Sequence, residues 1–255
     1  MAATQELIVS FTTWHARFQN IPAVLDTIFA QTLPPDRVVL NLADDELLPE
    51  SLQTYLDSHK VEVNRVPDTK VYKKLIPTLK KYPEACIVNI DDDWLYPPRM
   101  LEEFMRIHRE HPDCPISGNR ERNFHLQCHC GCASLTRRVF FGPYLDWIDD
   151  ELMRNCPSDD IVYTYLARRN GYKYIRTENL YFDNLTPYNP TAPYSVPDGT
   201  QVHASWKYLT ERFGPAEKTN LRTLATGFSN WLFELNRDQY CKKYLRLFGI
   251  TFYLE

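Results

Sequence analysis

The chain has 255 residues, of which 44% are hydrophobic and 24% charged, as in an ordinary soluble globular protein. Its formal net charge of −4 gives no general attraction to nucleic acid. No apolar stretch approaches the ~20 residues of a membrane span, and the first residues lack the basic region and apolar core of a secretory signal. Seven cysteines in a chain of this size indicate reduced thiols, so we expect a cytoplasmic protein.

Apolar runs and helical patterns alternate four times within the first 110 residues. The predicted strands are Leu7–Phe11, Arg37–Leu42, Val61–Val66 and a run that ends at Ile90. The predicted helices are Ile21–Gln31, Leu48–His59, Tyr72–Tyr82 and Arg99–His111. Because each parallel return of the chain needs a crossover, this alternation predicts an α/β fold with a mostly parallel sheet and helices on both faces.

The pattern becomes less regular after Pro112. Further strands are predicted at Ile116–Asn119 and Tyr172–Ile175, and helices at Asp149–Asn155, Ser158–Gly171, His203–Phe213 and Leu221–Arg237. A stretch rich in Pro, Asn and Tyr at 181–199 predicts an ordered loop. We therefore expect a core over residues 1–180, followed at 181–255 by this loop and a helical C-terminal extension that packs on the core.

The segment Cys86–Pro98 holds the most informative pattern, an apolar run that stops at Asp91, Asp92 and Asp93. The run has the character of a strand buried on both faces. Three ionised carboxylates cannot remain in such a core without partners, so they are expected at the carboxyl end of the strand, where open α/β sheets bind ligands. Crowded carboxylates favour a hard divalent cation together with phosphate oxygens; the alternative is an exposed acidic turn or a helix N-cap.

A second cluster contains His125, Cys128, His129, Cys130 and Cys132. Structural zinc needs four convergent ligands, commonly from paired cysteines. The C-x-C-x-C spacing places three thiols on one face of an extended segment, and no second pair follows nearby. We therefore interpret these cysteines as reduced thiols lining a strand rather than as a zinc site.

Four segments in this order resemble the GT-A glycosyltransferases, of the bacterial family-2-like kind that builds cell-surface polysaccharides. They are Leu7–Glu46, Val71–Pro83, Cys86–Pro98 and Ser158–Gly171, and they span about the first two thirds of the chain. The resemblance implies a nucleotide-sugar donor, a UDP-sugar in our interpretation, and a saccharide or lipid-linked saccharide acceptor. It also implies Mn²⁺ or Mg²⁺, because a cation that bridges both phosphates makes the nucleoside diphosphate a better leaving group.

The resemblance also suggests residues for the donor site. Asp91 corresponds to the aspartate that contacts the ribose, and Asp93 to the metal ligand, with Asp92 between them. The other expected donor-binding residues are Thr12, Thr13, Arg17, Asp44, Lys73 and Lys74. The two lysines and Arg17 have an alternative interpretation as solvated surface residues.

Asp159 and Asp160 resemble the acidic pair near the acceptor in inverting members of the family, where one carboxylate takes the proton of the attacking hydroxyl. We assign Asp160 as the base; the alternative is that two acids in the first turn of a helix complement its dipole. His203 is the best placed histidine for a further metal ligand. The basic and aromatic segment Tyr240–Glu255 is compatible with a membrane surface, a second subunit or, as we prefer, docking on the core.

Two rival functions stay open at this level. A sugar nucleotidyltransferase usually carries a glycine-rich basic stretch after its first strand, and Phe11–Asn20 contains no glycine. A non-catalytic saccharide-binding or scaffold protein that retained the fold would bind or cleave no donor. Retaining rather than inverting chemistry is also compatible with these motifs.

Overall fold

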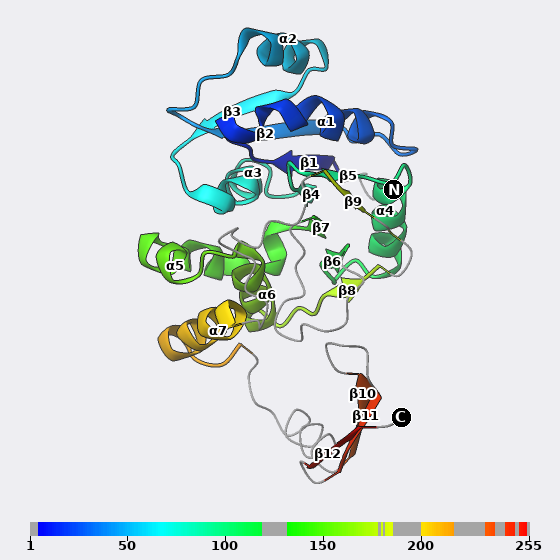
Figure 1. Cartoon of the computed structure of the whole chain (residues 1–255), viewed down its shortest axis with the longest axis vertical. Helices are drawn as coiled ribbons and strands as arrows, with labels where there is room; N and C mark the ends of the chain where they lie inside the picture. Colours follow the sequence, from blue (N-terminus) through cyan, green and yellow to red (C-terminus); the bar gives the residue numbers. More distant parts are fainter. Residues whose placement is uncertain are drawn as a thin grey trace.

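The computed structural model describes residues 5–118, 132–177, 180, 182–185, 200–216, 233–237, 243–247 and 250–253. Its centre is a seven-stranded sheet whose strands follow one another from the top of the molecule downward in Figure 1. In spatial order they are β3 (Glu62–Val66), β2 (Arg37–Ala43), β1 (Leu7–Phe11), β4 (Cys86–Ile90), β7 (Ala133–Thr136), β6 (Ile116–Ser117) and β8 (Ile175–Arg176). β7 is antiparallel to both its neighbours, and all other pairs are parallel. The predicted mostly parallel sheet is confirmed.

Helices cover both faces of this sheet, as predicted. The α-helices of the described core are α1 (Ile21–Phe29), α2 (Glu50–Ser58), α3 (Ile76–Lys81), α4 (Met100–Glu110), α5 (Asp150–Asn155), α6 (Asp159–Arg169) and α7 (Thr200–Phe213). Short 3-10 helices are η1 (His15–Asn20), η2 (Lys70–Lys74), η3 (Arg138–Phe140) and η4 (Gly142–Trp147). A small antiparallel ribbon joins β5 (Trp94–Leu95) to β9 (Asp183–Asn184).

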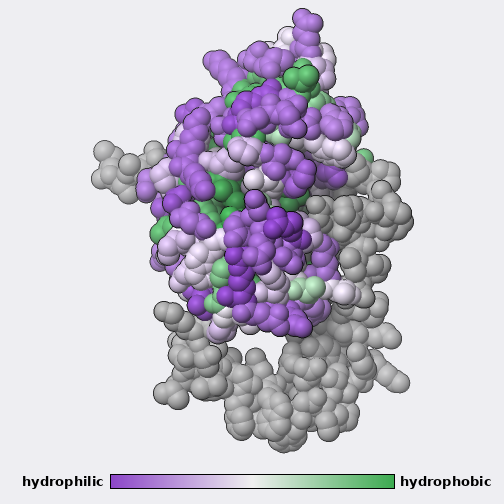
Figure 2. Space-filling model, turned by 90° about the vertical axis from the view of Figure 1, so that its left-hand side faces the viewer, coloured by the Kyte–Doolittle hydropathy of each residue, from purple (hydrophilic) through white to green (hydrophobic). Residues whose placement is uncertain are grey.

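Alternate residues of the central strands enter two separate hydrophobic cores, because successive side chains of a strand point to opposite faces. In β1, Leu7, Val9 and Phe11 pack with α1, α2 and α4, whereas Ile8 packs with α3, α5, α6 and α7. In Figure 1, α5, α6 and α7 lie together on one side of the sheet. Seen from that side, in Figure 2, hydrophilic residues cover most of the described surface.

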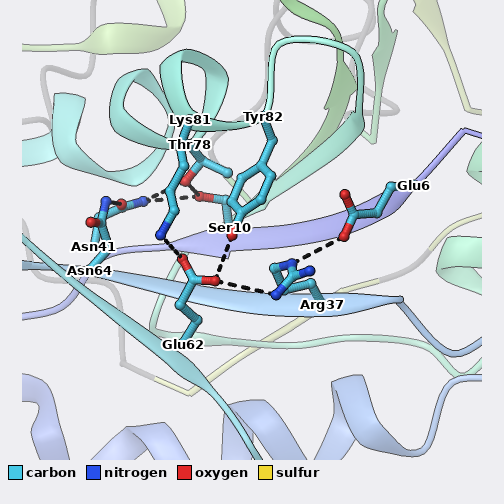
Figure 3. A network of polar contacts seen from close by, with 9 residues as sticks. All are labelled: Glu6, Ser10, Arg37, Asn41, Glu62, Asn64, Thr78, Lys81 and Tyr82. Carbon is cyan, nitrogen blue, oxygen red and sulfur yellow. Dashed lines mark hydrogen bonds and ion pairs between the residues drawn. The ribbon is translucent and has the colours of Figure 1, made fainter.

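Polar side chains replace apolar ones on the α3 side of the sheet near the carboxyl ends of β1 and β2. Asn41 donates to Ser10 Oγ at 3.1 Å and to Thr78 Oγ1 at 2.8 Å, and Asn64 donates to Asn41 Oδ1 at 2.8 Å (Figure 3). Ser10, Asn41 and Thr78 are fully buried. We call these four residues the Ser10–Asn41 network. It joins β1, β2, β3 and α3 close to the strand ends where the candidate site, described below, lies.

The helix predicted over Tyr72–Tyr82 is divided into η2 and α3. Pro77 explains the division, because proline has no amide hydrogen to donate to the carbonyl of Lys73, four residues earlier. α3 therefore starts anew at Ile76 with Pro77 in its first turn. Ser158 occupies the N-cap position of α6, as predicted, but its side chain makes no capping hydrogen bond.

The C-terminal extension is helical only in part. α7 confirms the helix predicted at His203–Phe213, but the helix predicted at Leu221–Arg237 is wrong in its last five residues, which form strand β10 (Phe233–Arg237). β10 pairs antiparallel with β11 (Lys243–Leu247), and β11 with β12 (Ile250–Tyr253). Over the five residues of β10, periodicity alone does not distinguish a strand from the end of a helix. Their antiparallel pairing with β11 makes them a strand.

Two further predictions concern thiols and membrane contact. Cys86, Cys114, Cys132 and Cys156 are in no disulfide, whereas Cys128 and Cys130 lie outside the described residues. Within the described part of the chain, no helix has both the length and the apolar character needed to cross a membrane.

Candidate active site

The three consecutive aspartates lie at the carboxyl end of β4, as the sequence predicts. β4 ends at Ile90, and Asp91, Asp92 and Asp93 follow it before the short strand β5 begins at Trp94. β4 is the strand next to β1 in the sheet. The ends of these two strands therefore place the aspartates beside Thr13 and η1.

Asp92 is the most enclosed of the three aspartates. Its carboxylate accepts a hydrogen bond from Thr13 Oγ1 at 2.7 Å and one from Arg17 Nη1 at 2.6 Å. Burial raises the pKa of Asp92 above its ordinary value, although Arg17 and Thr13 oppose this rise. Because both oxygens of Asp92 have partners and its residue is 5% exposed, it ties the β1–η1 connection to β4 rather than facing solvent.

Asp93 and Asp91 are more accessible and each contacts one cation. Arg17 Nη1 lies 3.1 Å from Asp93 Oδ2, and Lys74 Nζ lies 3.1 Å from Asp91 Oδ1. The backbone of Asp91 is held by Tyr96, whose hydroxyl accepts from the Asp91 amide at 3.0 Å and donates to the Asp91 carbonyl at 2.9 Å. Asp91 therefore has a fixed backbone and a side chain that reaches toward the site.

The acidic pair of α6 lies at the same place. Lys74 Nζ is 3.2 Å from Asp159 Oδ2 and 4.0 Å from Asp160 Oδ1. Asp159 is 3% exposed, while the Asp160 side chain keeps 15% of its surface exposed. The fold thus brings the carboxylates of β4 and of the start of α6 to one lysine.

The charges in this cluster do not cancel, because one ammonium faces three carboxylates. Burial raises the pKa of Asp159 well above its ordinary value; Lys74 opposes this rise, and the charges of Asp160 and Asp91 add to it. Burial by itself would lower the pKa of the Lys74 ammonium, but attraction by Asp159, Asp91 and Asp160 outweighs it and the pKa is raised. Lys74 therefore stays charged, and the excess negative charge favours a proton on Asp159.

Four other residues expected at the site lie outside this cluster. Thr12 Oγ1 donates to the Asn41 carbonyl at 2.7 Å, which places it at the adjoining strand end. Asp44 is exposed just after β2. Lys73 pairs with Asp68 in the η2 segment rather than with Asp91, Asp92 or Asp93. His203 is exposed in the first turn of α7.

The chemistry of the donor set suits a hard divalent cation. The Asp91 and Asp93 side chains supply carboxylate oxygens with 30% and 13% of their surface exposed, and such a cation completes its shell with phosphate oxygens and water. In the part of the chain that the structure describes, no three His, Cys, Asp or Glu side chains are grouped to hold a metal ion by themselves. Asp91 and Asp93 would thus hold the ion together with the donor's diphosphate, and the expected contribution of His203 stays a prediction.

Sequence reasoning did not identify Tyr96 or Asp68 as parts of this region. Tyr96 is 3% exposed and holds the backbone of Asp91. Its place between the aspartates and Pro97 was a usable signal, because a buried tyrosine hydroxyl normally finds a hydrogen-bond partner. Asp68 had no comparable signal, since its pairing with Lys73 depends on the turn geometry of η2.

No family model and no curated protein matches the chain. Solved structures do match. S. aureus TarS 1-349 in complex with UDP has a TM-score of 0.53 and 12% identity, over 88% of this chain and 78% of that chain. The mannosyltransferase PcManGT from Pyrobaculum calidifontis, in complex with GDP-Man and Mn²⁺, has a TM-score of 0.54 and 16% identity, over 91% of this chain and 82% of that chain.

A further structure of S. aureus TarS is also similar, with a TM-score of 0.54 and 14% identity over 69% of this chain. This chain spans 35% of the length of that one. At such identities the comparisons establish a shared fold.

Proposed function

The chain has the GT-A glycosyltransferase fold, and we propose on that basis that it transfers a sugar from a nucleotide-sugar donor to a hydroxyl group. We take the donor to be a UDP-sugar and the acceptor a saccharide or lipid-linked saccharide. In support, one of the similar structures contains UDP and another GDP-Man with Mn²⁺.

The observation that carries the proposal is the contact of Lys74 with both groups of acids. Asp91 follows β4, whereas Asp159 and Asp160 begin α6, yet all three lie within 4.0 Å of Lys74 Nζ. A group that binds the donor and a group that accepts a proton must be neighbours for sugar transfer, because the acceptor hydroxyl attacks the carbon from which the diphosphate leaves. The fold supplies this proximity.

On the donor side, Asp91 and Asp93 would hold Mn²⁺ or Mg²⁺, which neutralises charge that develops on the departing diphosphate. Thr12, Thr13 and Asp44 lie at or just beyond the carboxyl ends of β1 and β2, where the nucleoside would bind. Arg17 reaches Asp92 and Asp93 from η1 and offers a cation for the phosphates.

On the acceptor side, Asp160 acts as the general base. Its carboxylate takes the proton of the acceptor hydroxyl as the new bond to the anomeric carbon forms and the bond from that carbon to the phosphate oxygen breaks, with inversion. Asp160 is better suited to this role than Asp159, because its side chain is more exposed and the raised pKa of Asp159 favours its protonated form. General-base catalysis of this kind contributes about 10²–10⁴-fold to the rate.

The experiment is a panel of UDP- and GDP-sugars with Mn²⁺, scored for nucleoside diphosphate release with and without saccharide acceptors. The test variant is Asp160→Asn, and the matched control is Asp150→Asn, which removes an exposed acid from the first turn of α5. We expect Asp160→Asn to keep donor binding and lose transfer by about 10²-fold or more, and Asp150→Asn to behave as wild type. Normal transfer by Asp160→Asn would show that the base is another group.

The same panel separates the rival functions. Pyrophosphate release from a nucleoside triphosphate and a sugar phosphate would identify a nucleotidyltransferase. Neither binding nor turnover of any donor, with and without Mn²⁺, would favour a saccharide-binding or scaffold protein.

A further inference from the structure

Lys74, the last residue of η2, is unusual for a lysine, because it is only 4% exposed. Its ammonium lies 3.1 Å from Asp91, 3.2 Å from Asp159 and 4.0 Å from Asp160. A lysine ammonium has three hydrogens to donate and no capacity to accept. All the contacts described for this ammonium are thus with acids of the site.

The backbone of Lys74 is fixed from the sheet. Ser10 Oγ donates to the Lys74 carbonyl at 2.6 Å and lies 2.7 Å from Thr78 Oγ1. Both hydroxyls belong to the Ser10–Asn41 network shown in Figure 3. The ammonium of Lys74 therefore extends from an anchored peptide group.

The same 3-10 turn is also held from the side of α6. Tyr72 is 1% exposed, and its hydroxyl donates to the carbonyl of Cys156 at 2.5 Å, shortly before α6 begins. Lys73 pairs with Asp68 at the other side of the turn. η2 thus connects the sheet to the N-terminus of α6, with Lys74 at the junction.

We propose that Lys74 is a positioning residue that holds Asp160, together with Asp159, at a fixed distance from Asp91 and hence from the donor. The proposal rests on the proposed function above. It gives Lys74 a role other than the donor contact implied by the family resemblance, because its ammonium is enclosed by carboxylates. Lys74 then affects the rate of transfer through Asp160 and leaves the affinity for the donor unchanged.

The test compares variants at Lys74 and Asp159, and one control, with wild type. Lys74→Met removes the cation alone and leaves Asp159 buried without its partner. Lys74→Met combined with Asp159→Asn removes the cation and its buried acid together, so that no buried acid is left without its partner. Asp159→Asn alone shows what loss of that acid does by itself. Lys81→Met is the control, because it removes an ion-paired lysine of α3 that contacts Glu62, away from the site.

The measurements are thermal unfolding, UDP binding by calorimetry with Mn²⁺, and the kcat of transfer. We expect the double variant to fold, to bind UDP within about threefold of wild type and to lose kcat by up to about 10²-fold, the loss associated with a misplaced catalytic group. Asp159→Asn should lose less than the double variant. Lys74→Arg should recover part of the kcat, because it restores the cation.

Five results overturn the proposal. UDP affinity that falls beyond about threefold in the double variant would place Lys74 on the donor. If the double variant has the same kcat as Asp159→Asn, Lys74 only balances a buried charge. If neither variant that carries Lys74→Met folds, the role of Lys74 is structural. If the wild-type protein neither binds nor cleaves any donor, the proposed function fails and the positioning role fails with it. If the wild type is active and the double variant has the same kcat, only the positioning role is refuted.

Discussion

Replacement of Asn41 by leucine tests how much the Ser10–Asn41 network contributes to the fold and to the site above it. The two side chains have the same number of heavy atoms and the same branching, although leucine is the larger, so the change removes hydrogen bonds and keeps the shape of the side chain. Asn41 donates to Ser10 and Thr78 and accepts from Asn64. Because Asn41 is fully buried, no water replaces the lost partner.

The expected loss of stability follows from these three bonds. A buried hydrogen bond contributes about 1 kcal/mol net, and a buried polar group left without a partner costs about 1–3 kcal/mol. Ser10 and Thr78 keep each other as partners, at 2.7 Å between their hydroxyl oxygens, and the Asn64 amide is only half-buried, so the loss comes mainly from the three bonds themselves. We therefore expect Asn41→Leu to lower the free energy of unfolding by about 2–4 kcal/mol.

Urea unfolding, followed by tryptophan fluorescence, measures this loss. The control is Asn155→Leu, the same change at an exposed position of α5, where an effect within about 0.5 kcal/mol is expected. An Asn41→Leu protein as stable as wild type would refute the reasoning, since leucine packing would then compensate fully for the lost bonds.

Three further predictions follow from single contacts. Asp93→Asn should weaken UDP binding in Mn²⁺ about tenfold or more and leave metal-free binding unchanged, as calorimetry can show. Arg212 lowers the pKa of Asp149 to about 2, so the pair stabilises the fold fully above the unfolded pKa near 3.9 and loses this effect as the pH falls through 2. Because the carboxylate is half exposed, Asp149→Asn should cost about 1 kcal/mol or less at pH 7 and only a small part of that at pH 2, as urea unfolding at the two pH values can show. Gly142→Ala should lower the melting temperature by several degrees (about 1–3 kcal/mol), because φ is +54° and the new methyl would lie 2.9 Å from Asn170.

The first half of the fold could be predicted from the sequence because its signals are local. Leu7–Phe11 forms β1 as predicted, and β4 ends where the aspartates begin. Apolar runs of strand length and helical spacing report burial directly. The prediction of the mostly parallel sheet needed only their alternation along the chain.

The partners of the site residues could not be predicted in the same way. Lys73 and Lys74 are adjacent and chemically identical, yet one pairs with Asp68 and the other with Asp91 and Asp159. The difference arises from the 3-10 turn of η2, which rotates successive side chains by about a third of a turn. No periodic pattern in the sequence records that rotation. Strand β10 was missed for a similar reason, because the strand with which it pairs, β11, lies elsewhere in the chain.

The position of the site on the sheet nevertheless has a signature in the sequence. The side facing α1 and α4 stays apolar to the strand ends, at Phe11, Leu42 and Ile90. On the opposite side, apolar residues give way to Ser10 in β1, to Asn41 in β2 and to Asn89 in β4, all of them fully buried.

Buried polar groups need partners, so such a change on one side only indicates that other polar groups lie there. For Ser10 and Asn41 these groups are Thr78 and the backbone carbonyl of Lys74, and the ammonium of the same lysine contacts Asp159. Because side chains alternate along a strand, the position of the polar residue determines which face of the sheet it enters. A polar residue that interrupts a buried strand just before its carboxyl end therefore indicates which face of the sheet carries the site, as well as which end.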